Sequence, residues 1–173
     1  LFEAFREQVV ALEAGGADAC CIETMTAVDE AVLAVKAAKE HTRLEVIATF
    51  TFDRTAQGTY RTMMGVAPAE MAVALREAGA DIVGTNCGNG MERMIEIVRE
   101  IRTAVPDLPI LVHANAGMPR QVAGVDVFPE TPEMMAGYAA DLVAAGANII
   151  GGCCGTTPDH IRAIRERVAG PRT

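Results

Sequence analysis

Three cysteines lie within two short glycine-rich motifs. Cys87 lies in GTNCGNG (84–90), and Cys153 and Cys154 are adjacent in GGCCGTTP (151–158). Thiolates are strong zinc ligands, and three protein ligands leave one coordination position open for a substrate, as in catalytic zinc sites. The spacing does not resemble the paired CxxC motifs of structural zinc ribbons. The sequence therefore predicts a catalytic zinc site formed by Cys87, Cys153 and Cys154.

The cysteine count also bears on the compartment. Five cysteines are an odd number, and two pairs, Cys20–Cys21 and Cys153–Cys154, are adjacent in the chain, which is poor geometry for disulfides. Reduced thiols and a cytoplasmic location are expected. Cys20 and Cys21 lie within a predicted strand, so we expect them to pack in the core. Core packing is also the alternative to metal binding for the other three cysteines, because free cysteine is often buried.

An internal repeat predicts which polar residues accompany the thiols. The segments EAGGADACCIET (13–24), EAGADIVGTNCG (77–88) and AAGANIIGGCCG (144–155) each read as a helix end, a capping glycine and a short apolar strand. Strand ends in a parallel α/β fold share one rim, where ligands bind. The alignment places six residues at this rim: Glu23, Asn86 and Cys153 at one level, and Thr24, Cys87 and Cys154 at the next.

Three further side chains have more than one possible role. Glu23 ends an otherwise apolar strand, where its carboxylate could bind a cationic group of a ligand, help bind the metal, or be solvated. His113 and Asn115 end another strand. His113 could replace one thiol as a metal ligand, although a strand histidine is more commonly a hydrogen-bonded core residue. Asn115 is expected to be a polar positioning residue beside the metal.

The elements that must position these residues alternate between strand and helix. Apolar runs in the three repeats and at 44–52 and 109–117 predict five strands. Amphipathic stretches predict helices, three of which open with proline, and Thr131 and Thr157 stand at expected N-cap positions. The predicted helices span residues 28–40, 68–78, 91–103, 132–145 and 158–168. Apolar residues at the start of the chain also follow helical spacing, so a further helix is expected there.

Alternating strands and helices predict an α/β fold with a parallel sheet and right-handed crossovers. An eight-fold barrel of about 250 residues has about 31 residues per unit. We therefore expect residues 1–173 to form strands four to eight of a (β/α)8 TIM barrel, as a C-terminal fragment that begins inside a helix. The loops at 52–67 and 117–131 are long enough to serve as lids or docking surfaces, or to be plain surface decoration.

Composition excludes several classes of partner. The chain has 173 residues and a formal net charge of −8, which disfavours nucleic acid and anionic membrane surfaces. Its apolar runs are too short to cross a bilayer.

Four motifs resemble the homocysteine S-methyltransferases, which include the homocysteine-binding module of cobalamin-dependent methionine synthase. They are IET (22–24), GTNCGNG (84–90), HANAGMP (113–119) and above all GGCCGTTPDHI (151–161), and they occur in the family's order along the whole chain. The resemblance implies that residues 1–173 are part of a homocysteine-binding domain lacking its N-terminal strands. It also implies zinc held by Cys87, Cys153 and Cys154.

The resemblance further implies that Glu23 binds the homocysteine amino group. Thr24, Asn86 and Asn115 belong to motifs that line the same pocket. The expected reaction is zinc-dependent transfer of a methyl group to the thiol of homocysteine, giving methionine. The donor is a small molecule or a corrinoid methyl-carrier domain, so cobalamin enters through another domain or protein. No protein base is required, because a metal-bound thiol loses its proton near neutral pH.

Two alternatives belong to other classes. Glycine-rich turns at helix N-termini also bind phosphate, which would indicate a phosphosugar- or nucleotide-binding barrel enzyme. However, neither cysteine turn carries Lys or Arg within its glycines. The other alternative is a non-catalytic zinc-binding fragment.

Overall fold

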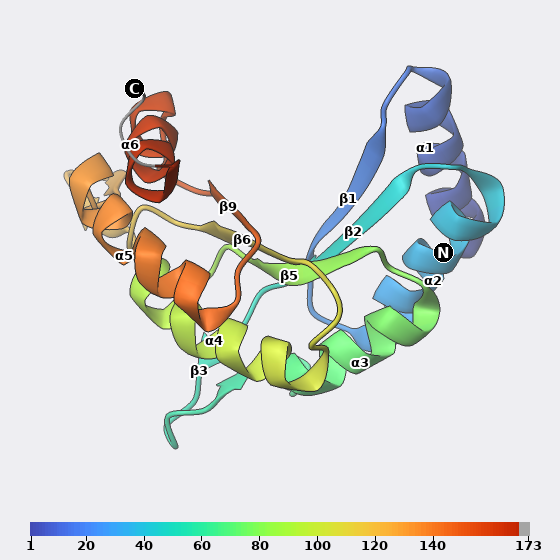
Figure 1. The fold of residues 1–173 in the computed structure, drawn as a ribbon, viewed down its shortest axis with the longest axis horizontal. Coiled ribbons are helices and arrows are strands. Elements are labelled where there is room, and N and C mark those ends of the chain that lie inside the picture. Colours follow the sequence, from blue (N-terminus) through green and yellow to red (C-terminus); the bar gives the residue numbers. More distant parts are fainter. Residues whose placement is uncertain (170–173) are drawn as a thin grey trace.

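A computed structural model describes residues 1–169, which form one curved sheet backed by a row of helices (Figure 1). The sheet is parallel, with its strands in the order β1-β2-β5-β6-β9. These strands span Ala19–Met25 (β1), Glu45–Phe50 (β2), Ile82–Asn86 (β5), Ile110–Ala114 (β6) and Ile149–Gly152 (β9). The helices span Phe2–Ala14 (α1), Val28–His41 (α2), Pro68–Ala78 (α3), Met91–Ala104 (α4), Pro132–Ala145 (α5) and Pro158–Ala169 (α6).

The predicted order of elements is confirmed, because local signals mark their ends. Helices α3, α5 and α6 begin at Pro68, Pro132 and Pro158. Helices α3 and α5 end at glycines with left-handed backbone, Gly79 and Gly146, as expected of capping glycines. The Thr131 hydroxyl caps α5 by accepting from the Met134 amide. The Thr157 hydroxyl bonds instead to the His160 ring, 2.9 Å away.

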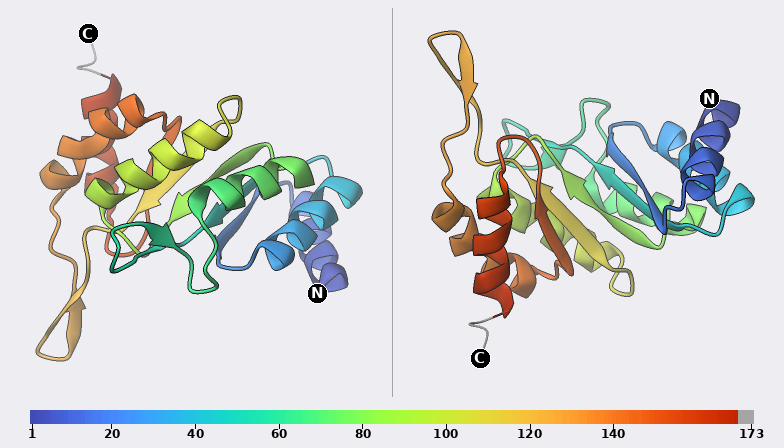
Figure 2. Two further views of the ribbon diagram at one scale, coloured as in Figure 1. Left: turned by 90° about the horizontal axis from the view of Figure 1, so that it is seen from below. Right: turned by 90° about the horizontal axis from the view of Figure 1, so that it is seen from above.

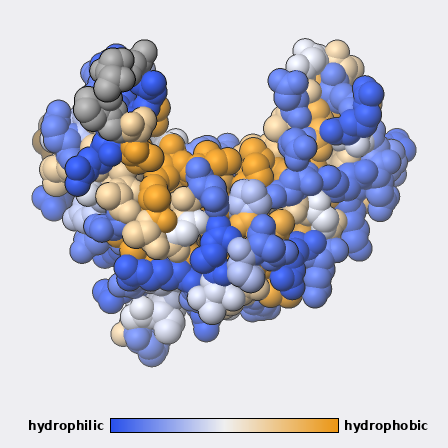
Figure 3. Space-filling view, viewed as in Figure 1, coloured by the Kyte–Doolittle hydropathy of each residue, from blue (hydrophilic) through white to orange (hydrophobic). Residues whose placement is uncertain are grey.

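The two faces of the sheet differ. Outward residues such as Val46, Ala48, Phe50 and Val112 are completely buried, and each helix packs against the next in chain order outside them (Figure 1). The opposite, concave face carries the alternate residues. In the space-filling view of Figure 3, apolar atoms gather in the hollow between the two raised ends of the molecule. We call this surface the inner face; it includes Cys21, Ile47, Ile82, Leu111, His113 and Ile149.

This arrangement corrects one sequence expectation. Cys20 is buried toward the helices, as predicted, but Cys21 is exposed on the inner face. Successive strand residues point to opposite faces, so adjacent cysteines cannot both pack under the helices. Within residues 1–169, β1 and β9 each have a sheet neighbour on one side, and the sheet does not close into a barrel.

Strand register shifts steadily across the first half of the sheet. Ile22 of β1 is in register with Ala48 of β2 and, through it, with Val83 of β5. In the sequence repeat, Ile22 is the fifth residue after the aligned alanine Ala17, whereas Val83 is the third after Ala80. Two steps across the sheet therefore shift the register by two residues.

The second half of the sheet repeats this shift in the same direction. Gly84 of β5 is in register with Leu111 of β6, which is in register with Ile149 of β9. Gly84 is the fourth residue after its aligned alanine and Ile149 is the second. An average shift of one residue per strand is the stagger of barrels whose shear equals their number of strands, a group that includes the eight-stranded barrel with a shear of eight.

Both long loops contain short antiparallel hairpins. The first pairs β3 (Asp53–Arg54) with β4 (Tyr60–Arg61), and the second pairs β7 (Arg120–Val122) with β8 (Val125–Val127). The β7–β8 hairpin projects away from the body of the molecule (Figure 2). Among the described residues, no helix has the length and apolar character needed to cross a membrane.

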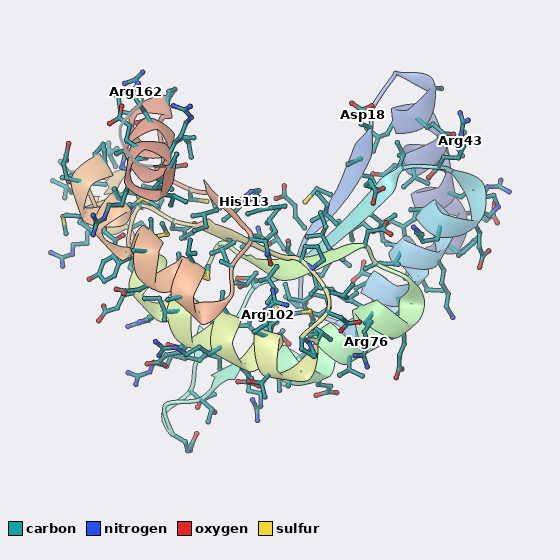
Figure 4. All side chains as sticks on the ribbon, viewed as in Figure 1. Asp18, Arg43, Arg76, Arg102, His113 and Arg162 are labelled. Atoms are coloured by element: carbon teal, nitrogen blue, oxygen red, sulfur yellow. The ribbon has the colours of Figure 1, made fainter. Side chains whose placement is uncertain are left out.

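Arg102 connects the segments at the amino-terminal ends of β6 and β9 (Figure 4). Its guanidinium donates to the carbonyls of Val105, Pro106, Leu108 and Gly146 and to Asn148 Oδ1. Several backbone carbonyls that would otherwise lack partners are thereby satisfied. This network lies at the opposite end of the strands from the cysteines and stabilises the scaffold that carries them.

Candidate functional site

The three predicted cysteines meet beyond the carboxyl ends of β5 and β9. Their Sγ atoms all lie within 4.8 Å of one another, with Cys87 3.7 Å and Cys153 4.0 Å from Cys154. Two thiolates bound tetrahedrally to zinc at about 2.3 Å stand about 3.8 Å apart. The spacing of the thiols therefore fits a zinc ion, and these three are the only such group of potential metal ligands among the described residues.

Backbone hydrogen bonds from β6 hold both cysteine turns. The Cys87 amide donates to the His113 carbonyl at 2.9 Å, and the Cys153 amide donates to the Ala114 carbonyl at 2.7 Å. The Cys154 carbonyl accepts from the Ala116 amide at 2.9 Å. Cys87 has a φ of +58°, a left-handed conformation that is uncommon outside glycine. β6 and the residues that follow it thus position thiols from two separate turns.

Side chains support the Cys153–Cys154 turn. Asn115 Oδ1 accepts a hydrogen bond of 3.1 Å from the Cys154 amide, and Thr156 Oγ1 donates to the Cys153 carbonyl at 2.7 Å. Gly155 has a φ of +79°, and a Cβ there would lie 2.1 Å from the Phe128 ring. Only glycine fits this close approach between the turn and the residue that follows the β7–β8 hairpin.

The environment of the thiols disfavours their charged forms when no cation is bound. The hydrogen bond with Cys87, followed by burial, raises the pKa of Cys154 to about 11. Burial, followed by the charge of Cys87, raises the pKa of Cys153. A bound divalent cation reverses this balance, because it stabilises thiolates. The cluster is therefore suited to a cation rather than to three free thiolates.

Glu23 is exposed on the inner face, next to Thr24 at the end of β1. The ring of His113, another inner-face residue, packs against Gly151, and a Cβ at Gly151 would approach that ring to 2.7 Å. Burial lowers the pKa of His113, and the negative charge of Glu23 opposes that effect. His113 is therefore a packed residue outside the three-cysteine group.

Asn86 and Thr24 are in direct contact. Asn86 is fully buried, its Oδ1 accepts from the Thr24 amide at 2.8 Å, and its Nδ2 donates to the Thr24 hydroxyl at 2.8 Å. Of the predicted site residues, Glu23, Thr24 and Cys154 are exposed, whereas Asn86 and Asn115 are buried. The predicted rim thus divides into exposed groups that a ligand can reach and buried amides that support them.

Two supporting residues were not predicted from the sequence. The Thr49 hydroxyl donates to Asn86 Oδ1 at 2.7 Å, and Asn89 Nδ2 donates to the Phe52 carbonyl at 2.6 Å. Both side chains are buried beside strand ends. Thr49 is a polar residue within the apolar run at 44–52, and Asn89 is a polar residue between two glycines. These unexpected polar positions are the sequence features from which a supporting role could have been predicted.

Comparisons with known proteins show the family to which the chain is related. The homocysteine S-methyltransferase family model matches residues 1–168. The methionine synthases of Mycobacterium leprae and Mycobacterium tuberculosis are each 32% identical to the chain over 173 residues, covering 96% of it. The chain spans only 14% of the length of each of these relatives.

Solved structures show the same fold. The apo crystal structure of the homocysteine methyltransferase MmuM from Escherichia coli matches with a TM-score of 0.74 and 24% identity, covering 96% of this chain and 57% of that one. The aldolase QR15 matches with a TM-score of 0.62 and 16% identity, covering 98% of this chain and 71% of that one. Given the family match over nearly its whole length, the chain belongs to the homocysteine S-methyltransferase family.

Proposed function

We propose that this chain is the zinc-bearing, homocysteine-binding part of an enzyme that methylates the thiol of homocysteine to give methionine. The observation that carries the proposal is the convergence of Cys87, Cys153 and Cys154 at distances that fit zinc. Family membership supports the substrate, since the matching family model describes homocysteine methyltransferases. The phosphate-binding alternative gains no support, because the glycine-rich turns bring together thiols rather than cationic side chains.

The five strands are proposed to be strands four to eight of a (β/α)8 barrel, so that residues 1–173 form part of a homocysteine-binding domain. The average register shift of one residue per strand fits such a barrel, whose shear equals its number of strands. The share of the solved methyltransferase that the chain covers, 57%, is close to five eighths. The inner face then becomes the barrel interior, and the thiols lie at the end of the barrel where catalytic groups gather.

Cys87, Cys153 and Cys154 would hold the zinc ion. Such an ion supplies an open position for a substrate thiol and keeps that thiol deprotonated, yet nucleophilic, near neutral pH, whereas a free thiol of pKa about 8.5 is mostly protonated. Three thiolates with one Zn²⁺ would give the centre a net charge of −1, which would preserve the electron density of a substrate sulfur held there. The substrate sulfur would form a bond to the methyl group as the bond between that group and its donor breaks. The donor would leave with the electron pair of that bond, and the thiol proton would pass to solvent.

The remaining site residues orient the amino acid. Exposed Glu23 would bind the ammonium group of homocysteine, beside Thr24 on the same strand end. Buried Asn86 and Asn115 complete the substrate-binding set by fixing the strand end and the Cys154 turn. Orientation of this kind brings the sulfur and the donor methyl group into line. The donor would arrive as a small molecule or on a corrinoid methyl-carrier domain, so cobalamin would be supplied by another domain or protein.

Metal analysis of single Cys→Ser variants tests the proposal. Elemental analysis should find one zinc per wild-type chain and its loss in variants at positions 87, 153 and 154. Cys20→Ser and Cys21→Ser are the matched controls and should retain zinc. The zinc-loaded full-length wild-type protein should then bind homocysteine, which calorimetry measures directly. Zinc loss only in the two controls, or no binding of homocysteine, would reject the assignment.

A further inference from the structure

One buried side chain connects three neighbouring strands at the site. Asn86, at the end of β5, accepts hydrogen bonds at Oδ1 from the Thr24 amide (2.8 Å) and the Thr49 hydroxyl (2.7 Å). Its Nδ2 donates to the Thr24 hydroxyl at 2.8 Å. β1 carries Thr24 and β2 carries Thr49. The amide group therefore acts within the protein, and its full burial keeps it away from solvent.

The contact falls where the pairing of β1 with β2 becomes irregular. The register shifts between Ile22 and Met25, and Thr24 has a φ of +61°. A left-handed conformation is strained for a β-branched residue and persists only where its surroundings enforce it. Asn86 does so through two hydrogen bonds, one to the backbone and one to the side chain of Thr24. Irregularities of this kind redirect neighbouring side chains, and here the neighbour is Glu23.

Asn86 is also the chain neighbour of one of the three thiol residues. Cys87 follows Asn86 directly, also has a left-handed backbone, and is held by the His113 carbonyl. The strand end that presents the Glu23 carboxylate is thereby tied to the turn that presents the Cys87 thiol. The amide supplies both the acceptor and the donor that Thr24 uses, whereas an ionised aspartate would lack the donor and an aliphatic side chain would lack both groups.

We propose that Asn86 is a positioning residue: it holds Thr24 in its left-handed conformation and so fixes the Glu23 carboxylate relative to the three thiols. This inference rests on the proposed function, in which Glu23 binds the ammonium group and the thiols hold zinc. It assigns Asn86 no contact with the substrate. Asn86 sets the contribution of the amino group to homocysteine affinity, whereas binding of a thiol that lacks an amino group does not depend on Glu23.

The test uses the full-length protein that contains this chain, loaded with zinc or with cobalt as a spectroscopic substitute. Homocysteine and 4-mercaptobutanoate, which is homocysteine without its amino group, are titrated by calorimetry. Asn86→Ala should weaken homocysteine binding about 10- to 100-fold, in line with coupling energies between contacting residues. Its metal content, its cobalt–thiolate spectrum and its affinity for 4-mercaptobutanoate should stay at wild-type values.

Three further variants separate positioning from general damage. Thr24→Val removes the hydroxyl that Asn86 contacts and should weaken homocysteine binding in the same selective way, while Thr24→Ser should restore much of the loss. Thr26→Val is the matched control two residues along. In a double-mutant cycle, Asn86→Ala should have little further effect in a Glu23→Gln background, because both changes disrupt the same interaction.

The outcomes distinguish this inference from the proposed function. If the loaded wild-type protein binds neither thiol, the proposed function and this inference both fail. If it binds homocysteine and both Asn86→Ala and Thr24→Val bind equally well, only the role of Asn86 is overturned. Equal weakening of both thiols, or additive effects in the cycle, likewise overturns it. If Asn86→Ala does not fold, Thr24→Val decides the question by the same measurements.

Discussion

The Cys154 amide donates a hydrogen bond of 3.1 Å to the side-chain oxygen of Asn115, which directly follows β6. Asn115 is itself held, because its own amide donates to the Asn89 carbonyl at 2.9 Å. The orientation of the Cys154 thiol thus depends on a residue that is distant in sequence and on the turn that carries Cys87. Residues that orient metal ligands in this way contribute strongly to metal affinity.

Asn115→Ala should therefore weaken zinc binding by about 10- to 100-fold while leaving all three thiols in place. Competition against a chromophoric chelator measures the affinity. Asn148→Ala is the matched control, since Asn148 contacts Arg102 and the Ile110 amide at the other end of the strands. That variant should keep wild-type zinc affinity. An unchanged affinity in Asn115→Ala would show that the Cys154 turn holds its shape unaided.

Glu23→Gln should weaken homocysteine binding and leave the zinc content unchanged. A hydrogen bond to a charged group contributes about 1.5–3 kcal/mol, which corresponds to roughly 10- to 150-fold in affinity. Calorimetric titration of the zinc-loaded full-length protein measures this change, and elemental analysis checks the metal. Unchanged affinity would remove Glu23 from the binding site. Loss of zinc would make Glu23 a metal ligand instead.

Much of the scaffold was predictable because its signals are local. Helices at 68–78 and 132–145 match prediction at both ends, since proline marks the start of each and glycine the end. The meeting of Cys87 with Cys153 and Cys154 was also predictable, because the internal repeat places both motifs at strand ends. Parallel topology then brings such ends to one rim.

The details missed by sequence reasoning depend on register between strands that are far apart in the chain. The bond from Thr49 to Asn86 and the left-handed backbone of Thr24 both arise from how β1, β2 and β5 align. No local pattern encodes that alignment. The exposure of Cys21 likewise depends on which face of β1 the helices cover, which the run of apolar residues around it does not reveal.

The Asp81 carboxylate, just before β5, predicts a dependence of stability on pH. Burial would raise the pKa of Asp81, but hydrogen bonds from the Val46 amide (2.8 Å) and the Lys39 ammonium (2.9 Å) outweigh it, so the pKa lies below its ordinary value. A depressed pKa means that the ionised group stabilises the fold. Its contribution is complete above the unfolded-state pKa of about 3.9 and is lost as the pH falls through the lower, folded-state value.

Asp81→Asn should therefore lower the free energy of unfolding at pH 7 and lose this effect in strong acid. Denaturant titrations of the full-length protein at several pH values give the difference from wild type. Asp107→Asn is the control, because Asp107 is more exposed and lies 3.7 Å from Arg76. A difference between wild type and Asp81→Asn that stays constant with pH would show that the charge of Asp81 is not what stabilises the strand.

A protein consisting only of residues 1–173 should associate in solution rather than remain a stable monomer. Its inner face exposes apolar side chains, with Ile149 38% exposed at one edge strand, and β1 and β9 each lack a second sheet neighbour within the described residues. Uncovered apolar surface and open strand edges both promote association, and a net charge of −8 opposes it only weakly at physiological salt.

Sedimentation velocity at increasing concentration measures this association. Ile149→Lys should reduce association, whereas Met63→Lys, at an exposed position in the loop before α3, should not. A wild-type monomer with one sharp cooperative melt would instead show that five strands bury a sufficient core.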